Sequence, residues 1–138
     1  WVHSVDRAKI ARALERQGAG IERPLNICLQ VNVSGEAAKS GCTPEEVAEL
    51  AETVAAECPH LRLRGLMAIP AASGDPRPAF ERLADLLADL RQRGVPGAWD
   101  SLSMGMSNDF EQAIACGATH VRVGTALFGG RDYGDQQE

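Results

Sequence analysis

The sequence contains no long apolar run and no cluster of basic residues. A transmembrane helix needs about 20 consecutive apolar residues, and every apolar stretch here is much shorter. The 14 lysines and arginines are scattered, and the 19 acidic residues leave a net charge of −5. This balance argues against a surface for nucleic acid or anionic lipid. Because no secretory signal is recognisable either, we expect a soluble cytoplasmic protein.

The four cysteines, Cys28, Cys42, Cys58 and Cys116, include no Cys-x-x-Cys pair. A zinc site needs clustered ligands at short spacing, and Cys58 with nearby His60 does not supply them. Disulfide bonds are typical of secreted chains, which this sequence does not resemble. We therefore expect four free thiols, buried or half-buried.

Strand and helix signals alternate along the 138 residues, a length that suits one domain with a core. Apolar β-rich runs predict strands, and amphipathic stretches with capping residues predict helices between them. The expected strands cover residues 2–5, 25–33, 63–69, 99–104 and 120–125. The expected helices begin at Asp6, at Thr43, near Phe80 and at Ser107 or Asn108. They end near Gln17, Cys58, Gly94 and Cys116.

Five strands, each followed by a helix or helical turn, predict an α/β fold with a parallel sheet and right-handed crossovers. A closed (β/α)8 barrel of the TIM type takes about 250 residues. The chain is therefore predicted to be part of such a barrel, about five βα units, or a small open doubly wound sheet. Since the sequence begins at Trp1 inside strand-like residues, we expect an N-terminal part to precede it.

Two glycine-containing segments stand where a ligand would bind, at the carboxyl ends of the last two expected strands. Residues 103–109 open a helix, where Ser107 adds a hydroxyl to the unpaired backbone amides. In residues 121–125, Gly124 lets a ligand approach the backbone and Thr125 can donate a further hydrogen bond. In barrels this is the habitual phosphate site. The alternative is two tight turns needed only for packing.

Arg122 lies two residues before Gly124, and hence on the same face of the expected strand. A buried arginine needs an acceptor, whereas an exposed one would only form a salt bridge, and both readings stay open. His3, His60 and His120 have no partners at the spacing of a triad or metal site. We expect them to be solvated or at the edge of the core.

Several segments match one known family in order along the chain. They are residues 30–34 (QVNVS), 36–41, 65–70 (GLMAIP), 102–107 (LSMGMS), 121–125 (VRVGT) and 128–133 (FGGRDY). Together they closely resemble the pyridoxal 5′-phosphate (PLP) homeostasis proteins, single-domain relatives of the alanine racemase barrel. The resemblance covers essentially the whole chain. It implies the C-terminal part of a (β/α)8 barrel of the alanine racemase N-terminal-domain type.

The resemblance implies a set of cofactor-binding residues: Met67, Met104, Gly105, Met106, Ser107, Arg122, Gly124 and Thr125. In this set Ser107, Gly124 and Thr125 hold the phosphate, and Arg122 faces the pyridine nitrogen. A guanidinium stays protonated, so it keeps that nitrogen unprotonated and weakens the ring as an electron sink. The implied function is a non-catalytic carrier or buffer of intracellular PLP.

Family members hold PLP as a Schiff base on a lysine of the first barrel strand, ahead of the residues that this sequence matches. Lys9 and Lys39 are the only lysines here. Lys9 is expected on an outer helix. Lys39 is expected in a loop on the ligand face, where it either contacts the anionic cofactor or is solvated. Residues 1–138 are thus expected to form a single partial PLP-binding barrel domain without the strands that carry the Schiff-base lysine.

Two enzymatic alternatives stay open. A PLP-dependent amino-acid racemase takes a catalytic tyrosine from a second domain, and Tyr133 lies in a terminal tail. Another phosphate-binding barrel enzyme needs carboxylates or lysines at strand ends, whereas Asp75, Asp100 and Asp109 fall in loops or beside turns. The carrier function is preferred, with PLP-dependent enzymes as possible partners. An exposed strand edge at residues 2–5 predicts self-association of this chain, and a monomeric full-length form.

Overall fold

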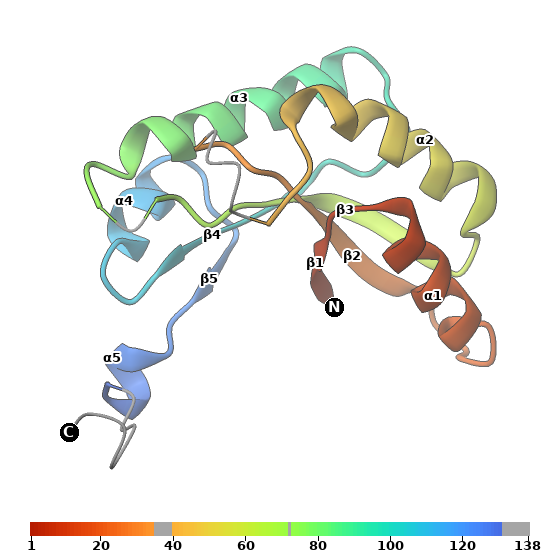
Figure 1. Cartoon of the computed structure of the whole chain (residues 1–138), viewed down its shortest axis with the longest axis horizontal. Coiled ribbons are helices and arrows are strands. Elements are labelled where there is room, and N and C mark those ends of the chain that lie inside the picture. Colours follow the sequence, from red (N-terminus) through yellow and green to blue (C-terminus); the bar gives the residue numbers. More distant parts are fainter. Residues whose placement is uncertain (35–39, 72, 131–138) are drawn as a thin grey trace.

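The computed structural model describes residues 1–34, 40–71 and 73–130, and a five-stranded parallel sheet forms its centre (Figure 1). The strands are β1 (Val2–Val5), β2 (Leu25–Gln30), β3 (Leu61–Met67), β4 (Ser101–Met106) and β5 (His120–Arg122), paired in that order. Parallel neighbours need crossover connections. These contain α1 (Ala8–Gly18), the 3₁₀ turn η1 (Pro44–Glu46) with α2 (Val47–Glu57), α3 (Arg77–Gln92) and α4 (Phe110–Ala115). The short helix α5 (Thr125–Phe128) follows β5.

The helices α1 to α4 gather on one side of the sheet, while α5 projects away from it (Figure 1). A doubly wound sheet would carry helices on both faces and reverse its strand order at a switch point. Here the strand order simply follows the sequence. The arrangement is that of an open part of a barrel, so the doubly wound alternative does not apply.

The core lies between the sheet and the helices. It contains alternate strand residues, among them Leu29, Leu66, Leu102 and Met104, packed with the apolar faces of α2 and α3. Fully burying one such side chain contributes about 1.5–3 kcal/mol. Because successive strand residues point to opposite faces, the neighbours of these core residues line the other face of the sheet. Those neighbours are Cys28, Gln30, Met67 and Ser103, all buried as well.

The sheet is curled, so that its two outer strands approach each other across the helix-free face. The ring of His3 in β1 lies 5.5 Å from that of His120 in β5, and Trp1 lies 4.7 Å from His120. No strand pairing joins β1 to β5. The rings therefore meet across the face itself, as inward side chains do inside a barrel.

The predicted ends of several elements are corrected by the structure. Helix α1 begins at Ala8, after Arg7, and the Asp6 carboxylate instead accepts a hydrogen bond from the Gly41 amide at 3.2 Å. Asp109, rather than Ser107 or Asn108, directly precedes α4. Sequence patterns locate a helix to within a few residues, and local hydrogen bonds decide its first turn. At Thr43 the expected start is confirmed, with Glu46 completing the capping box.

The last two strands also differ from their predicted ranges. Strand β4 runs to Met106, so that Gly105 and Met106 belong to it rather than to a turn. Gly105 has φ 105°, and a Cβ atom there would lie 2.7 Å from the Cβ of Ala113 in α4. Strand β5 already ends at Arg122, and Gly124 precedes the first residue of α5.

The expectation of free thiols is confirmed. Cys28, Cys42 and Cys58 are buried and Cys116 is half-buried. Burial raises the pKa of the Cys28 and Cys42 thiols to about 11. Among the described residues, no group of three or more histidine, cysteine or acidic side chains could hold a metal ion. Within the same ranges no helix is both long and apolar enough to cross a membrane.

Candidate functional site

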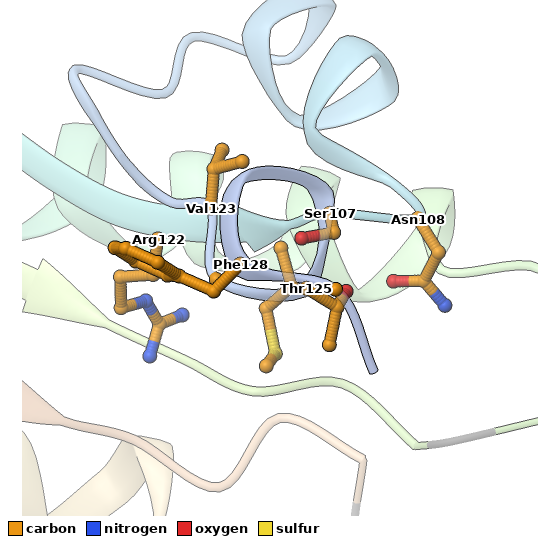
Figure 2. Close-up of a pocket in the computed structure, with 9 residues that line it drawn as sticks. Ser107, Asn108, Arg122, Val123, Thr125 and Phe128 are labelled. Carbon is orange, nitrogen blue, oxygen red and sulfur yellow. The ribbon is translucent and has the colours of Figure 1, made fainter. Parts of the chain in front are cut away.

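A pocket of about 710 Å³ opens where β4 and β5 end (Figure 2). It is lined by Met106, Ser107, Asn108, Arg122, Val123, Gly124, Thr125, Phe128 and Gly129. Ser107 and Asn108 enter it from the end of β4, whereas Arg122, Thr125 and Phe128 come from β5 and α5. The two segments that the sequence predicts to bind a ligand therefore meet at one cavity.

Five of the predicted site residues line this pocket: Met106, Ser107, Arg122, Gly124 and Thr125. Met104 does not, because it is fully buried in the core under the helices. Met67 lies on the helix-free face at the carboxyl end of β3, 5% exposed. Gly105 is buried against α4, behind the pocket-lining residues of its own segment. Lys39 lies outside the described residues.

Ser107 joins the two segments that line the pocket. Its Oγ accepts a hydrogen bond from the backbone amide of Ala126 in α5 at 2.9 Å. The hydroxyl proton of Ser107 is not used by this bond and is free to be donated. Together with the Thr125 hydroxyl and the exposed backbone at Gly124, it makes this corner of the pocket rich in hydrogen-bond donors.

Arg122 forms the half-buried wall of the pocket. One of its terminal nitrogens, Nη2, donates a hydrogen bond to the carbonyl oxygen of Ala68 at 2.9 Å. Burial lowers the pKa of the guanidinium, against the opposing charge of Asp109, yet arginine remains a cation. Its Nε is buried and has no hydrogen-bond partner within the described ranges. A buried donor without a partner costs about 1–3 kcal/mol, so a ligand acceptor brought to Arg122 Nε would remove this cost.

The sequence of residues 1–132 matches the family model described as alanine racemase, N-terminal domain. The chain belongs to this family. Among curated members, the pyridoxal phosphate homeostasis protein of Pseudomonas aeruginosa is 58% identical over 137 residues, which are 97% of this chain and 57% of that protein. The protein of the same name from Escherichia coli K12 is 49% identical over 136 residues, 96% of this chain and 57% of its own length. The resemblance to PLP homeostasis proteins is thereby confirmed.

Solved structures agree with the α/β partial barrel. PipY of Synechococcus elongatus, with PLP bound, superposes with a TM-score of 0.82 at 32% identity, over 94% of this chain and 60% of that one. Alanine racemase of Corynebacterium glutamicum shares the fold, with a TM-score of 0.66 at 18% identity over 99% of this chain and 37% of that one. The chain thus spans somewhat more than half the length of the curated relatives that it matches.

In this family member the structure also reveals polar contacts that the sequence does not predict. His3 Nδ1 lies 2.6 Å from the Oγ of Ser103, although 100 residues separate them. The ring of His120 packs edge-on against His3, and the His60 ring forms a hydrogen bond with the Glu15 carboxylate. The sequence signal for the contact of His3 with Ser103 is weak. It consists only of polar residues at inward positions of apolar strands, and the contact itself requires the curl of the sheet.

The His3 side chain is expected to make folding stability depend on pH. Burial lowers its pKa below 6.5, helped by the nearby charges of His120 and Arg122. Between that lowered pKa and 6.5 the unfolded chain binds more protons than the folded one, so stability is lost as pH falls through this window. We expect the free energy of unfolding in urea to drop from pH 7.5 to 5 less steeply in H3Q than in the wild type. Equal slopes for the two proteins would contradict this.

Proposed function

We propose that this chain binds PLP in the pocket at the ends of β4 and β5, as part of a protein that holds the cofactor without turning it over. The observation that carries the proposal is the buried Arg122 Nε, a donor without a partner among the described residues, in the wall of that pocket. Relatives named pyridoxal phosphate homeostasis proteins, and a PLP-bound structure in the same family, support the choice of ligand.

The pocket residues fit the two ends of such a ligand. The Ser107 and Thr125 hydroxyls and the backbone at Gly124 would bind the phosphate, because all three offer donors at one corner. Arg122 would donate its Nε proton to the ring nitrogen while Nη2 keeps its bond to Ala68. Met67 precedes Ala68 at the end of β3 and would contact the ring, with Met106 from β4. Lys39 remains a proposed contact.

Arg122 also supports a carrier rather than an enzyme. PLP serves catalysis as an electron sink, and this capacity is greatest when its ring nitrogen is protonated. Arg122 stays a cation and can donate but not accept a proton, so it would hold the ring nitrogen unprotonated.

We further propose that the chain supplies about five βα units, the C-terminal part of an eight-unit barrel. Delivery to PLP-dependent enzymes in the cytoplasm is part of the same proposal.

The proposal is tested by titrating the purified chain with PLP and with pyridoxal, which lacks the phosphate. We expect saturable PLP binding, followed by calorimetry and by absorbance between 300 and 500 nm. Pyridoxal should bind at least about tenfold more weakly, because it forgoes the charge-assisted hydrogen bonds. Borohydride treatment and mass spectrometry then report whether Lys9 or Lys39 becomes modified. Equal affinity for both ligands, or no binding of either, would contradict the proposal.

A further inference from the structure

The turn that carries Ser107 into the pocket is closed from both sides by Asp109. The Asp109 amide donates a hydrogen bond to the carbonyl oxygen of Met106 at 3.1 Å. In return the Asp109 carboxylate accepts one from the Met106 amide at 2.7 Å. Two bonds between the same two residues hold Ser107 and Asn108 between them. The bond to the carboxylate is charge-assisted, which makes it about twice as strong as a neutral one.

Asp109 is also fixed to the helix behind it and acts on the pocket only through its neighbours. Its carbonyl oxygen accepts a hydrogen bond from the Ala113 amide of α4 at 3.1 Å. Asp109 itself does not line the pocket, whereas Met106, Ser107 and Asn108 all do. Ser107 in turn is joined to α5, because its hydroxyl oxygen accepts a hydrogen bond from the Ala126 amide. The carboxylate is thus connected to both pocket-lining segments, to the first directly and to α5 through Ser107.

We propose that Asp109 is a positioning residue for the phosphate of PLP, an inference that rests on the proposed function. Its hydrogen bond to Met106 favours phosphate binding, because it holds the Ser107 hydroxyl in place. Its negative charge acts against phosphate, because Asp109 lies only two residues from Ser107 at the phosphate corner of the pocket and anions repel one another. Substitution can separate the two effects.

Replacing Asp109 with Asn or with Ala separates the effect of the hydrogen bond from that of the charge. In D109N the amide oxygen still accepts the Met106 proton, but the negative charge is gone. In D109A both are lost. We expect D109A to bind PLP about tenfold more weakly than the wild type, the usual cost of one well-placed hydrogen bond. D109N should bind PLP at least as tightly as the wild type. Pyridoxal, without a phosphate, should bind equally to all three proteins.

Asp75 provides a matched control. Its carboxylate accepts a hydrogen bond from the Arg77 amide at 3.0 Å at the start of α3, and Asp75 does not line the pocket. D75A removes the same kind of bond, so it should leave the PLP affinity unchanged. Circular dichroism and thermal melting of each variant show whether it is folded. If D109A does not fold, the PLP affinity of D109N is compared with that of the wild type. Weaker binding by D109N would then overturn the role of Asp109.

The possible results separate this inference from the proposed function. No PLP binding by the wild type would overturn both. Binding by the wild type together with an unchanged D109A would overturn only the role of Asp109. The role of Asp109 would also be overturned if D109N bound PLP as weakly as D109A does. The same holds if D109A lost equal affinity for PLP and for pyridoxal. Weak D109A, tight D109N and an effect confined to the phosphate-bearing ligand support the role.

Discussion

Replacing Gly65 with alanine is expected to destabilise the fold by about 3 kcal/mol or more. Gly65 in β3 pairs with Ser101 in β4. A Cβ atom at position 65 would lie 1.7 Å from the carbonyl oxygen of Ser101 and 2.6 Å from its carbonyl carbon. These are backbone atoms in the middle of the sheet, so they cannot rotate away. Small domains have about 5–15 kcal/mol of stability in total, and β3 would have to separate locally from β4.

The measurement is the free energy of unfolding in urea, followed by circular dichroism. Gly20 serves as the control, since a Cβ atom there has nothing within 4 Å. We expect G20A to unfold within about 0.5 kcal/mol of the wild type, as surface substitutions usually do. A G65A protein that unfolds with the same midpoint as G20A would show that the sheet can open at this position without loss.

Replacing Arg122 with leucine should weaken PLP binding by about ten- to a hundredfold, because a buried charged donor is lost from the ligand. The fold should suffer much less. Leucine removes a desolvated charge and an Nε that has no partner in the described part of the chain, at the cost of one bond to Ala68. R122K should bind PLP with an affinity between those of the wild type and R122L. Lysine keeps the charge but lacks the planar fork that serves two acceptors at once.

PLP affinity and unfolding free energy of R122L and R122K are measured side by side. The exposed Arg82 supplies the control. It also donates to a backbone carbonyl, that of Pro78 at 3.3 Å in α3. R82L should bind PLP as the wild type does. If R122L retained the wild-type affinity, Arg122 would have only a structural role, and the proposed contact with the ring nitrogen would be wrong.

Much of the architecture was predictable because its signals are local. Apolar periodicity and capping residues located the strands and helices, and the rule that ligands bind at the carboxyl ends of strands brought residues 103–109 and 121–125 to one place. Both segments do line the pocket. Their chemistry follows from residue types that sequence displays directly, a serine and a threonine near glycines and an arginine in an apolar strand.

The rest depends on register and curvature, which no local pattern reveals. The pairing of β4 with β5 shifts between Ser103 and Met106. Met104 thereby enters the core while Met106 reaches the pocket. Likewise, the contact of His3 with Ser103 needs the curl of the whole sheet. Gly124 and Thr125 were expected to end a strand, but their backbone turns into α5. The role of Lys39 stays a prediction.

The order of the strands has a consequence for how the chain folds. Each strand pairs with the next one in sequence, so no pairing has to close a loop longer than one βα connection, and the entropy cost of loop closure grows with loop length. The sheet can therefore grow one βα unit at a time. The rings of Trp1 and His3 meet His120 only after all five strands are in place. These contacts are expected to form last on folding and to be lost first on unfolding.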